Sequence, residues 1–96
     1  MKFLVTWSVP DLDQRHATLR GFSESNSEED QALMGESLSM IGRWHDLVGC
    51  TGAAVVESDD AAAVANYFLN WNHVCDLDVT PVLDDEETRA VGRSRD

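Results

Sequence analysis

The sequence contains little positive charge, only two prolines and only two cysteines. Seven lysine and arginine residues stand against eighteen aspartate and glutamate residues, which gives a formal net charge of -11 over 96 residues. This balance argues against DNA or RNA as a partner, because nucleic-acid binding needs a basic surface that neutralises phosphates. Cys50 and Cys75 form no CxxC pair and are too few for a disulfide framework. We therefore expect two free thiols and a cytoplasmic protein.

Long hydrophobic runs are also missing. No stretch reaches the roughly 18 apolar residues that a membrane-spanning helix needs. The opening MKFLVTWSVPD has a short apolar run with no small-residue cleavage site after it, so it predicts a strand and not a signal peptide. The hydrophobic content of 43% is that of an ordinary folded protein. Residues 1–96 are thus expected to form a single domain without membrane contact.

Regular patterns run through most of the chain. Two segments show the apolar periodicity of helices, one from Leu12 to Phe22 and an alanine-rich one over residues 58–73. The alternation typical of strands occurs in four segments: residues 2–9, 37–45, 52–58 and 74–82. We find no internal repeat.

The remaining segments are polar. Residues 23–37 are acidic and rich in serine, which predicts a loop with room for one helical turn over 28–34. Residues 83–92 predict one or two closing helical turns, and residues 92–96 a frayed tail.

The resulting order, strand-helix-strand-strand-helix-strand, is the split βαβ arrangement of ferredoxin-like folds. It predicts an α+β protein with a four-stranded antiparallel sheet in the order 4-1-3-2 and both helices on one face. Strict alternation assigns to the helix-covered face Phe3, Val5, Trp7, Met40, Trp44, Ala54, Val56, Leu77 and Val79. The other face then receives Leu4, Thr6, Ser8, Ile41, Arg43, His45, Val55, Glu57, Asp76, Asp78 and Thr80.

The second of these faces has two alternative uses. It can face water, as one side of many antiparallel sheets does. It can instead pack against the same face of a second chain, which its apolar members Leu4, Ile41 and Val55 favour. A β-bulge at Gly42 would shift the register by one residue and exchange the faces of Trp44 and His45.

Three segments resemble a known family: MKFLVTWSV, GRWHDLVGCTGAAVVESDD and NWNHVCDLDVTPVLDDEE. Together they are similar to a small uncharacterised family, domain of unknown function 3303, in the dimeric α/β-barrel superfamily. The resemblance covers most of the chain outside residues 23–37. It implies a ferredoxin-like protomer whose sheet packs face to face with that of a twofold mate. The superfamily includes cofactor-free monooxygenases and isomerases, but the family has no established catalytic residues, so no role is transferred to this chain.

His45 and Arg43 are the first candidates for a functional site. His45 stands near a glycine-rich connection, where a general base could sit. Arg43 lies two positions earlier on the same face and could hold an anionic group of a substrate. Alternatively Arg43 pairs with Glu57 or Asp78 across the sheet, and both side chains only stabilise a dimer.

Two carboxylates and one aromatic residue complete the candidate set. Asp76 and Asp78 share a face, an arrangement that could raise the pKa of one carboxyl group, although simple exposure or pairing with Arg43 is the alternative. With His45 they would offer mixed nitrogen and oxygen ligands, but no HxH or ExxH spacing supports a metal site, and we expect none. Trp71, one turn after Tyr67, could flank a pocket or simply pack in the core.

Other motifs are absent. Gly49 and Gly52 form no phosphate-binding loop, and a turn that requires positive φ would explain both. The sequence therefore predicts a homodimer that binds a small organic ligand without a cofactor. It leaves open whether that dimer is a monooxygenase- or isomerase-like enzyme, with His45 as base and Arg43, Glu57, Asp76, Asp78 and Trp71 around the substrate. The alternative is a non-catalytic binding or stress-associated module whose polar sheet face is the dimer interface.

Overall fold

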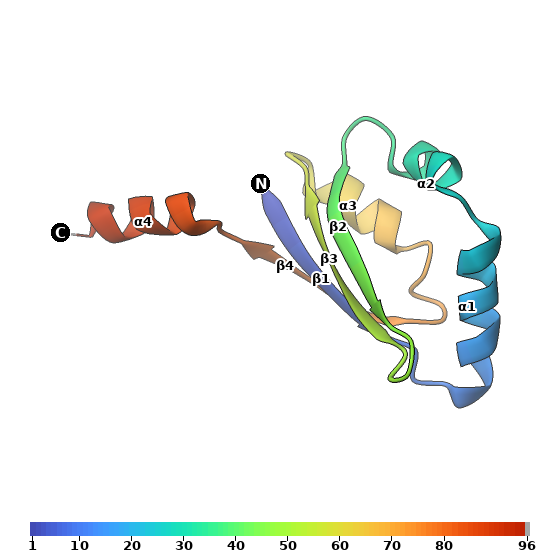
Figure 1. Ribbon diagram of the computed structural model, residues 1–96. Helices are drawn as coiled ribbons and strands as arrows, with labels where there is room; N and C mark the ends of the chain where they lie inside the picture. The colour runs from blue at the N-terminus through green and yellow to red at the C-terminus, as the bar shows by residue number, and fades with distance from the viewer. Residues whose placement is uncertain (96) are drawn as a thin grey trace.

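The computed structural model describes residues 1–95 and consists of one sheet with helices around it (Figure 1). Its strands are β1 (Lys2–Ser8), β2 (Ser39–Asp46), β3 (Thr51–Glu57) and β4 (Asp76–Val82). Its helices are a 3-10 turn (Leu12–Gln14), α1 (Arg15–Glu24), α2 (Ser27–Met34), α3 (Ala61–Phe68) and α4 (Asp85–Ser94). All three strand pairs are antiparallel and the order is β2-β3-β1-β4. The predicted α+β, ferredoxin-like sheet is thereby confirmed.

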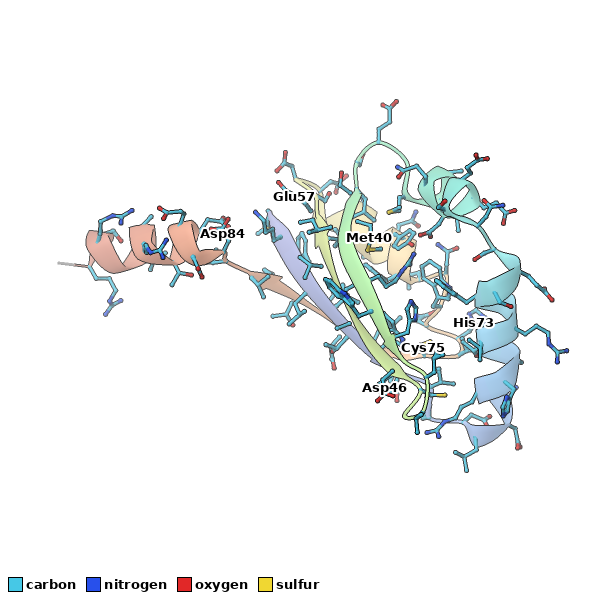
Figure 2. All side chains as sticks on the ribbon, in the orientation of Figure 1. Met40, Asp46, Glu57, His73, Cys75 and Asp84 are labelled. Atoms are coloured by element: carbon cyan, nitrogen blue, oxygen red, sulfur yellow. The ribbon has the colours of Figure 1, made fainter. Side chains whose placement is uncertain are left out.

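The helices divide between the two sides of this sheet. In Figure 1, α1, α2 and α3 lie on one side, whereas α4 projects beyond the other. The core lies between the sheet and α3 and consists of Phe3, Val5, Leu38, Ala54, Val56, Val64, Tyr67 and Phe68. Met40 packs against this core from the helix side of β2 (Figure 2). Val79, expected on the covered face, is 39% exposed because β4 is the edge strand.

The acidic segment 23–37 holds a complete helix, α2, where a loop with one helical turn was expected. Asn26 caps it by accepting a hydrogen bond from the Glu29 amide, and the Asn26 side chain donates in turn to the Glu29 carboxylate. Three acidic residues in the first turn stabilise the helix by interacting with the positive end of its dipole. Gly35 ends the helix with a φ of 68°, a conformation that glycine adopts without strain.

The helices after β3 also differ from the sequence-based expectation. α3 ends at Phe68, and turns carry the chain from there to β4. α4 continues to Ser94, so residues 92–94 are helical and not a frayed tail. Its start is fixed by a capping box between Asp84 and Glu87. Asp96 lies outside the described residues.

A β-bulge in β2 reverses the predicted faces of its second half. Met40 pairs with Val56 but Gly42 pairs with Val55, so Ile41 is the extra residue. From there on Arg43 and His45 lie on the helix side, and Trp44 lies on the other. The assignment by strict alternation is therefore wrong for these three residues, because one inserted residue changes the parity of every side chain after it.

The glycines of the β2–β3 connection have a different role from the one expected. Neither Gly49 nor Gly52 has a positive φ; within residues 1–95 the non-glycine residue that does is Cys50, at 52°. Gly52 is required by close approach instead. A Cβ atom there would lie 2.1 Å from the Trp7 ring and 2.7 Å from the Trp44 carbonyl oxygen.

Candidate functional site

The bulge brings Arg43 into a polar network between the sheet and the helices. Arg43 Nη2 forms an ion pair with Asp30 Oδ2 of α2 at 2.5 Å. Arg43 Nη1 donates a hydrogen bond to Tyr67 Oη of α3 at 3.1 Å, and the Tyr67 hydroxyl donates to the second Asp30 oxygen. These three side chains thus tie β2, α2 and α3 together, and the guanidinium charge is neutralised within the molecule.

His45 lies next to this network, among aromatic rings. Its imidazole contacts the Phe22 ring of α1 at 4.8 Å between centroids and the Trp7 ring at 5.6 Å. The Arg43 guanidinium also stacks over the Phe22 ring, 5.2 Å from its centroid. The Trp7 ring reaches His45 across Gly52, which has no side chain to separate them. His45, Phe22, Trp7 and Arg43 form what we call the aromatic cluster.

Burial and charge shift the pKa values of two members of the site. Desolvation, followed by the positive charge of Arg43, lowers the pKa of His45. His45 is therefore neutral at neutral pH and can accept a proton. Desolvation, followed by the hydrogen bond to Asp30, raises the pKa of Tyr67 well above its usual range. The phenol thus stays protonated and acts as a hydrogen-bond donor.

A small depression opens beside the ion pair. It has a volume of about 110 Å³ and is lined by Phe22, Ser25, Asn26, Ser27, Asp30 and Arg43. Pockets that enclose drug-sized ligands measure about 300–1,000 Å³, whereas one water occupies about 30 Å³. The depression therefore accommodates a small polar group or a few waters, and it borders the aromatic cluster through Phe22 and Arg43.

The family model for "Domain of unknown function (DUF3303)" matches residues 1–95 of this chain. The chain belongs to this family. No curated protein matches the sequence significantly. Among residues 1–95 of this DUF3303 chain, no helix combines the length and the apolar character needed to cross a bilayer.

Three of the candidate site residues of this DUF3303 chain lie away from Arg43 and His45. Asp76 and Asp78 do share a face, but they are exposed on β4, opposite Ser8 and Thr6, on the side of the sheet without α1–α3. Glu57 lies at the end of β3 and forms an ion pair with Lys2 at 3.8 Å. The expected pairing of Arg43 with Glu57 or Asp78 is wrong, because the bulge turns Arg43 to the opposite face.

Trp71 lies on the helix side, as part of the core rather than of an open pocket. Its ring meets Tyr67 edge to face, with 4.8 Å between centroids, and it packs against the core cluster. Trp71 therefore helps to fix the position of the Tyr67 ring. Asp76 and Asp78 lie on one face of the sheet and His45 lies on the other. Among residues 1–95, no three His, Cys, Asp or Glu side chains are placed to hold a metal ion.

Asp30 and Phe22 are the site residues that the sequence analysis missed. Asp30 lies within the acidic stretch that was interpreted as a solvated loop, yet it is only 14% exposed. The signal that indicates a helix there is Asn26 followed by Glu29 three residues later, a typical helix start. Nothing in the sequence pattern distinguishes Asp30 from its acidic neighbours.

Proposed function

We propose that this DUF3303 protein is a homodimeric binding module of the dimeric α/β-barrel type. It binds a small organic ligand over the aromatic cluster and does not catalyse a reaction there. The observation that carries this proposal is the ion pair between Arg43 and Asp30. An arginine whose charge is neutralised by a neighbouring carboxylate and a phenol is a structural element of the fold. It is not free to hold the charge that develops in a reaction.

The aromatic cluster supports the choice of ligand. Phe22 is 43% exposed although it stacks on both His45 and Arg43, so one side of its ring is accessible. A planar organic molecule can stack on exposed aromatic rings, and a polar substituent can enter the depression between Phe22 and Asn26. The pairing of an apolar surface with a few polar groups is typical of small-molecule sites.

The dimer would form through the open face, which is the sheet surface without α1–α3. Trp44 is 63% exposed there, Ile41 is 53% exposed and Leu4 is 38% exposed. Large apolar side chains grouped on one face mark an interaction site. Pairing this face with itself would bury Trp44, and tryptophan is enriched among the residues that dominate interface energy.

Light scattering on the purified chain tests the dimer. We expect twice the chain mass of 10.6 kDa at micromolar concentration. Trp44→Asp places a charge in the apolar surface and should yield a folded monomer. Asn72→Asp, an equal change of charge at an exposed turn on the helix side, should leave the dimer intact. A monomeric parent protein, or a dimer that tolerates Trp44→Asp, would refute this interface.

Titration of ¹⁵N-labelled protein with indole and with benzoate tests the ligand site. Saturable shifts are expected at Phe22, Ser25 and His45, and Phe22→Ala should abolish them for both probes. His16→Ala, at an exposed position of the same helix, is the matched control. Shifts that do not saturate, or that persist in Phe22→Ala, would contradict the site.

A second candidate function is supported by the lowered pKa of His45. A neutral imidazole beside aromatic rings could abstract a proton from a bound substrate, as a monooxygenase- or isomerase-like enzyme would require. Comparison of the parent protein with His45→Gln separates the two functions. If both proteins bind the ligand and neither changes it chemically, the module is favoured. If the parent protein changes the ligand chemically and His45→Gln does not, the enzyme is favoured.

The remaining partner and location assignments are also proposals. The two free cysteines favour a reducing compartment such as the cytoplasm. Burial raises the pKa of the Cys75 thiol, which keeps it unreactive. The net charge of -11 supports a protein that does not bind nucleic acid.

A further inference from the structure

The C-terminal arm, which we define as residues 83–95, stands apart from the rest of the molecule. Figure 1 shows α4 beyond the open face, on the side of the sheet opposite to α1–α3. Every residue from Leu83 to Arg95 is exposed, and Leu83 and Val91 are at least half exposed. Only its base is held, where Lys2 Nζ lies 3.4 Å from Asp84 Oδ2 (Figure 2) and 3.9 Å from Glu87 Oε1.

The dimensions of the molecule show how much surface the arm leaves uncovered. The Cα radius of gyration is 15.3 Å, whereas a compact domain of this length has about 12.5 Å. The accessible surface is 6742 Å², whereas a compact monomer of 10.6 kDa exposes about 5,500 Å². The excess, about 1,200 Å², exceeds the roughly 800 Å² that each partner contributes to a standard interface. The exposed area of this chain is thus large enough to include an interface of standard size.

The short length of α4 also indicates that it packs against another surface. An isolated helix shorter than about 12–15 residues is marginal in water, and α4 has 10. Its Glu86, Arg89 and Arg93 lie on one side together with Ala90, and Val91 lies on the other. An amphipathic helix of this kind is stabilised when its apolar side packs against another surface.

The charges of the arm indicate what that surface is. Arg89, Arg93 and Arg95 are three of the seven basic residues of the chain, and no acidic residue stands between positions 88 and 95. The open face beside the arm carries Asp76 and Asp78 at its exposed edge. The first turn of the arm is acidic and its end, residues 88–95, is basic, so the acidic edge of a second copy of the same chain offers this end opposite charge.

We propose that the C-terminal arm clasps a second copy of this chain, so that α4 of each protomer packs along the edge of the partner's open face. This inference rests on the proposed dimer. A second copy bound to the open face would lie between the sheet and the arm, within reach of α4. Twofold symmetry makes the contact reciprocal, and each arm then covers surface that the sheet-to-sheet contact leaves open. Exchange of terminal elements between protomers is a low-cost route to a dimer.

Paramagnetic broadening between chains tests this arrangement. A nitroxide is attached at Ser94→Cys in a Cys50→Ser background, which leaves Cys75 buried, and the labelled chain is mixed with an equal amount of ¹⁵N-labelled parent chain. The amide signals of β4 and β2 in the ¹⁵N chain should lose up to about half of their intensity, because half of the ¹⁵N chains pair with a labelled chain. A nitroxide at Asn72→Cys, on the helix side, should leave those signals unchanged.

The outcomes distinguish the arm from the dimer. If light scattering shows a dimer but the ¹⁵N chain is not broadened, the clasp is overturned and the dimer stands. If β4 and β2 are broadened in a chain that carries both the nitroxide and ¹⁵N, but not in the mixed sample, the arm folds back on its own sheet and the clasp is equally overturned. A monomer in light scattering overturns the proposed dimer together with the clasp.

A variant of the apolar side of α4 provides an independent measurement. Val91→Asp should raise the dissociation constant of the dimer at least tenfold, as followed by sedimentation. Asn72→Asp is the control of equal charge and should leave the constant unchanged. An unchanged constant in Val91→Asp would contradict packing of this side against the partner.

Discussion

Arg43 on β2 and Asp30 on α2 form an ion pair with 2.5 Å between Nη2 and Oδ2, and their side chains are only 19% and 14% exposed. The pair joins the sheet to a helix that otherwise buries no residue fully. Removal of one partner leaves the other charged group largely desolvated. Partly buried charged pairs are costly to break for this reason, even where their net contribution to stability is small.

Asp30→Ala should therefore destabilise the fold by about 2–3 kcal/mol, the cost of leaving a desolvated charged donor without its acceptor. Urea unfolding followed by circular dichroism measures this change. The double variant Asp30→Ala/Arg43→Met should recover part of the loss, because neither charge then remains. Glu28→Ala, on an exposed face of the same helix, serves as the reference. Equal stability of Asp30→Ala and Glu28→Ala would show that the pair is not structural.

Gly52 and Gly42 form a matched pair for testing close contacts around the bulge. A Cβ atom at Gly52 would meet both the Trp7 ring and a backbone oxygen, which cannot move aside. Gly52→Ala should thus cost about 2–3 kcal/mol through overpacking. A Cβ atom at Gly42 would meet the far end of the Trp44 ring, which is exposed and can rotate. Gly42→Ala should cost clearly less in the same denaturation assay, and the reverse order would contradict the register of β2.

His45 should titrate below the ordinary histidine value of 6.5. NMR detection of its imidazole signals measures the midpoint, and Arg43→Met, which removes a neighbouring positive charge, should raise it. Because the folded pKa lies below the unfolded one, the unfolded state binds the proton first. The contribution of His45 to stability is thus complete above about pH 6.5 and is lost as the pH falls through the folded pKa. A midpoint at or above 6.5 would contradict this.

The fold was predictable because it depends on patterns that many residues share. The alternation in β1 and β3 and the alanine-rich helix α3 follow from burial on one side, and they determine the strand order together with the split βαβ rule. The site depends on single residues instead. The bulge at Ile41 has no pattern of its own beyond the neighbouring Gly42, yet it decides on which face Arg43 and His45 lie.

Asp30 shows the same limit for a long-range contact. Its partners Arg43 and Tyr67 are 13 and 37 residues away. Residues 28–30 are all acidic, and this local composition predicts only that the segment is exposed to solvent. Tyr67 was predicted to lie near Trp71 from helical spacing, and the two rings are indeed in contact.

The base of the C-terminal arm should depend on Asp84. Its hydrogen bond from the Glu87 amide, followed by its contacts with Lys2, lowers the pKa of Asp84. The cap is therefore present above the unfolded value of 3.8 and is lost as the pH falls through the folded pKa. Asp84→Ala should reduce the helical ¹³C shifts of residues 85–89 at neutral pH, whereas Asp85→Ala should change them little. Unchanged shifts in Asp84→Ala would show that the capping box does not hold the helix.

The position of His45 relative to the bulge is the central claim, because the site and the open face both depend on it. Nuclear Overhauser contacts of the His45 ring protons, recorded with ¹³C-labelled protein, test it directly. The structure predicts contacts from His45 to the rings of Phe22 and Trp7. Contacts from His45 to Thr6 or Val55, combined with contacts from Trp44 to Tyr67, would place the residues on the opposite faces and contradict the account.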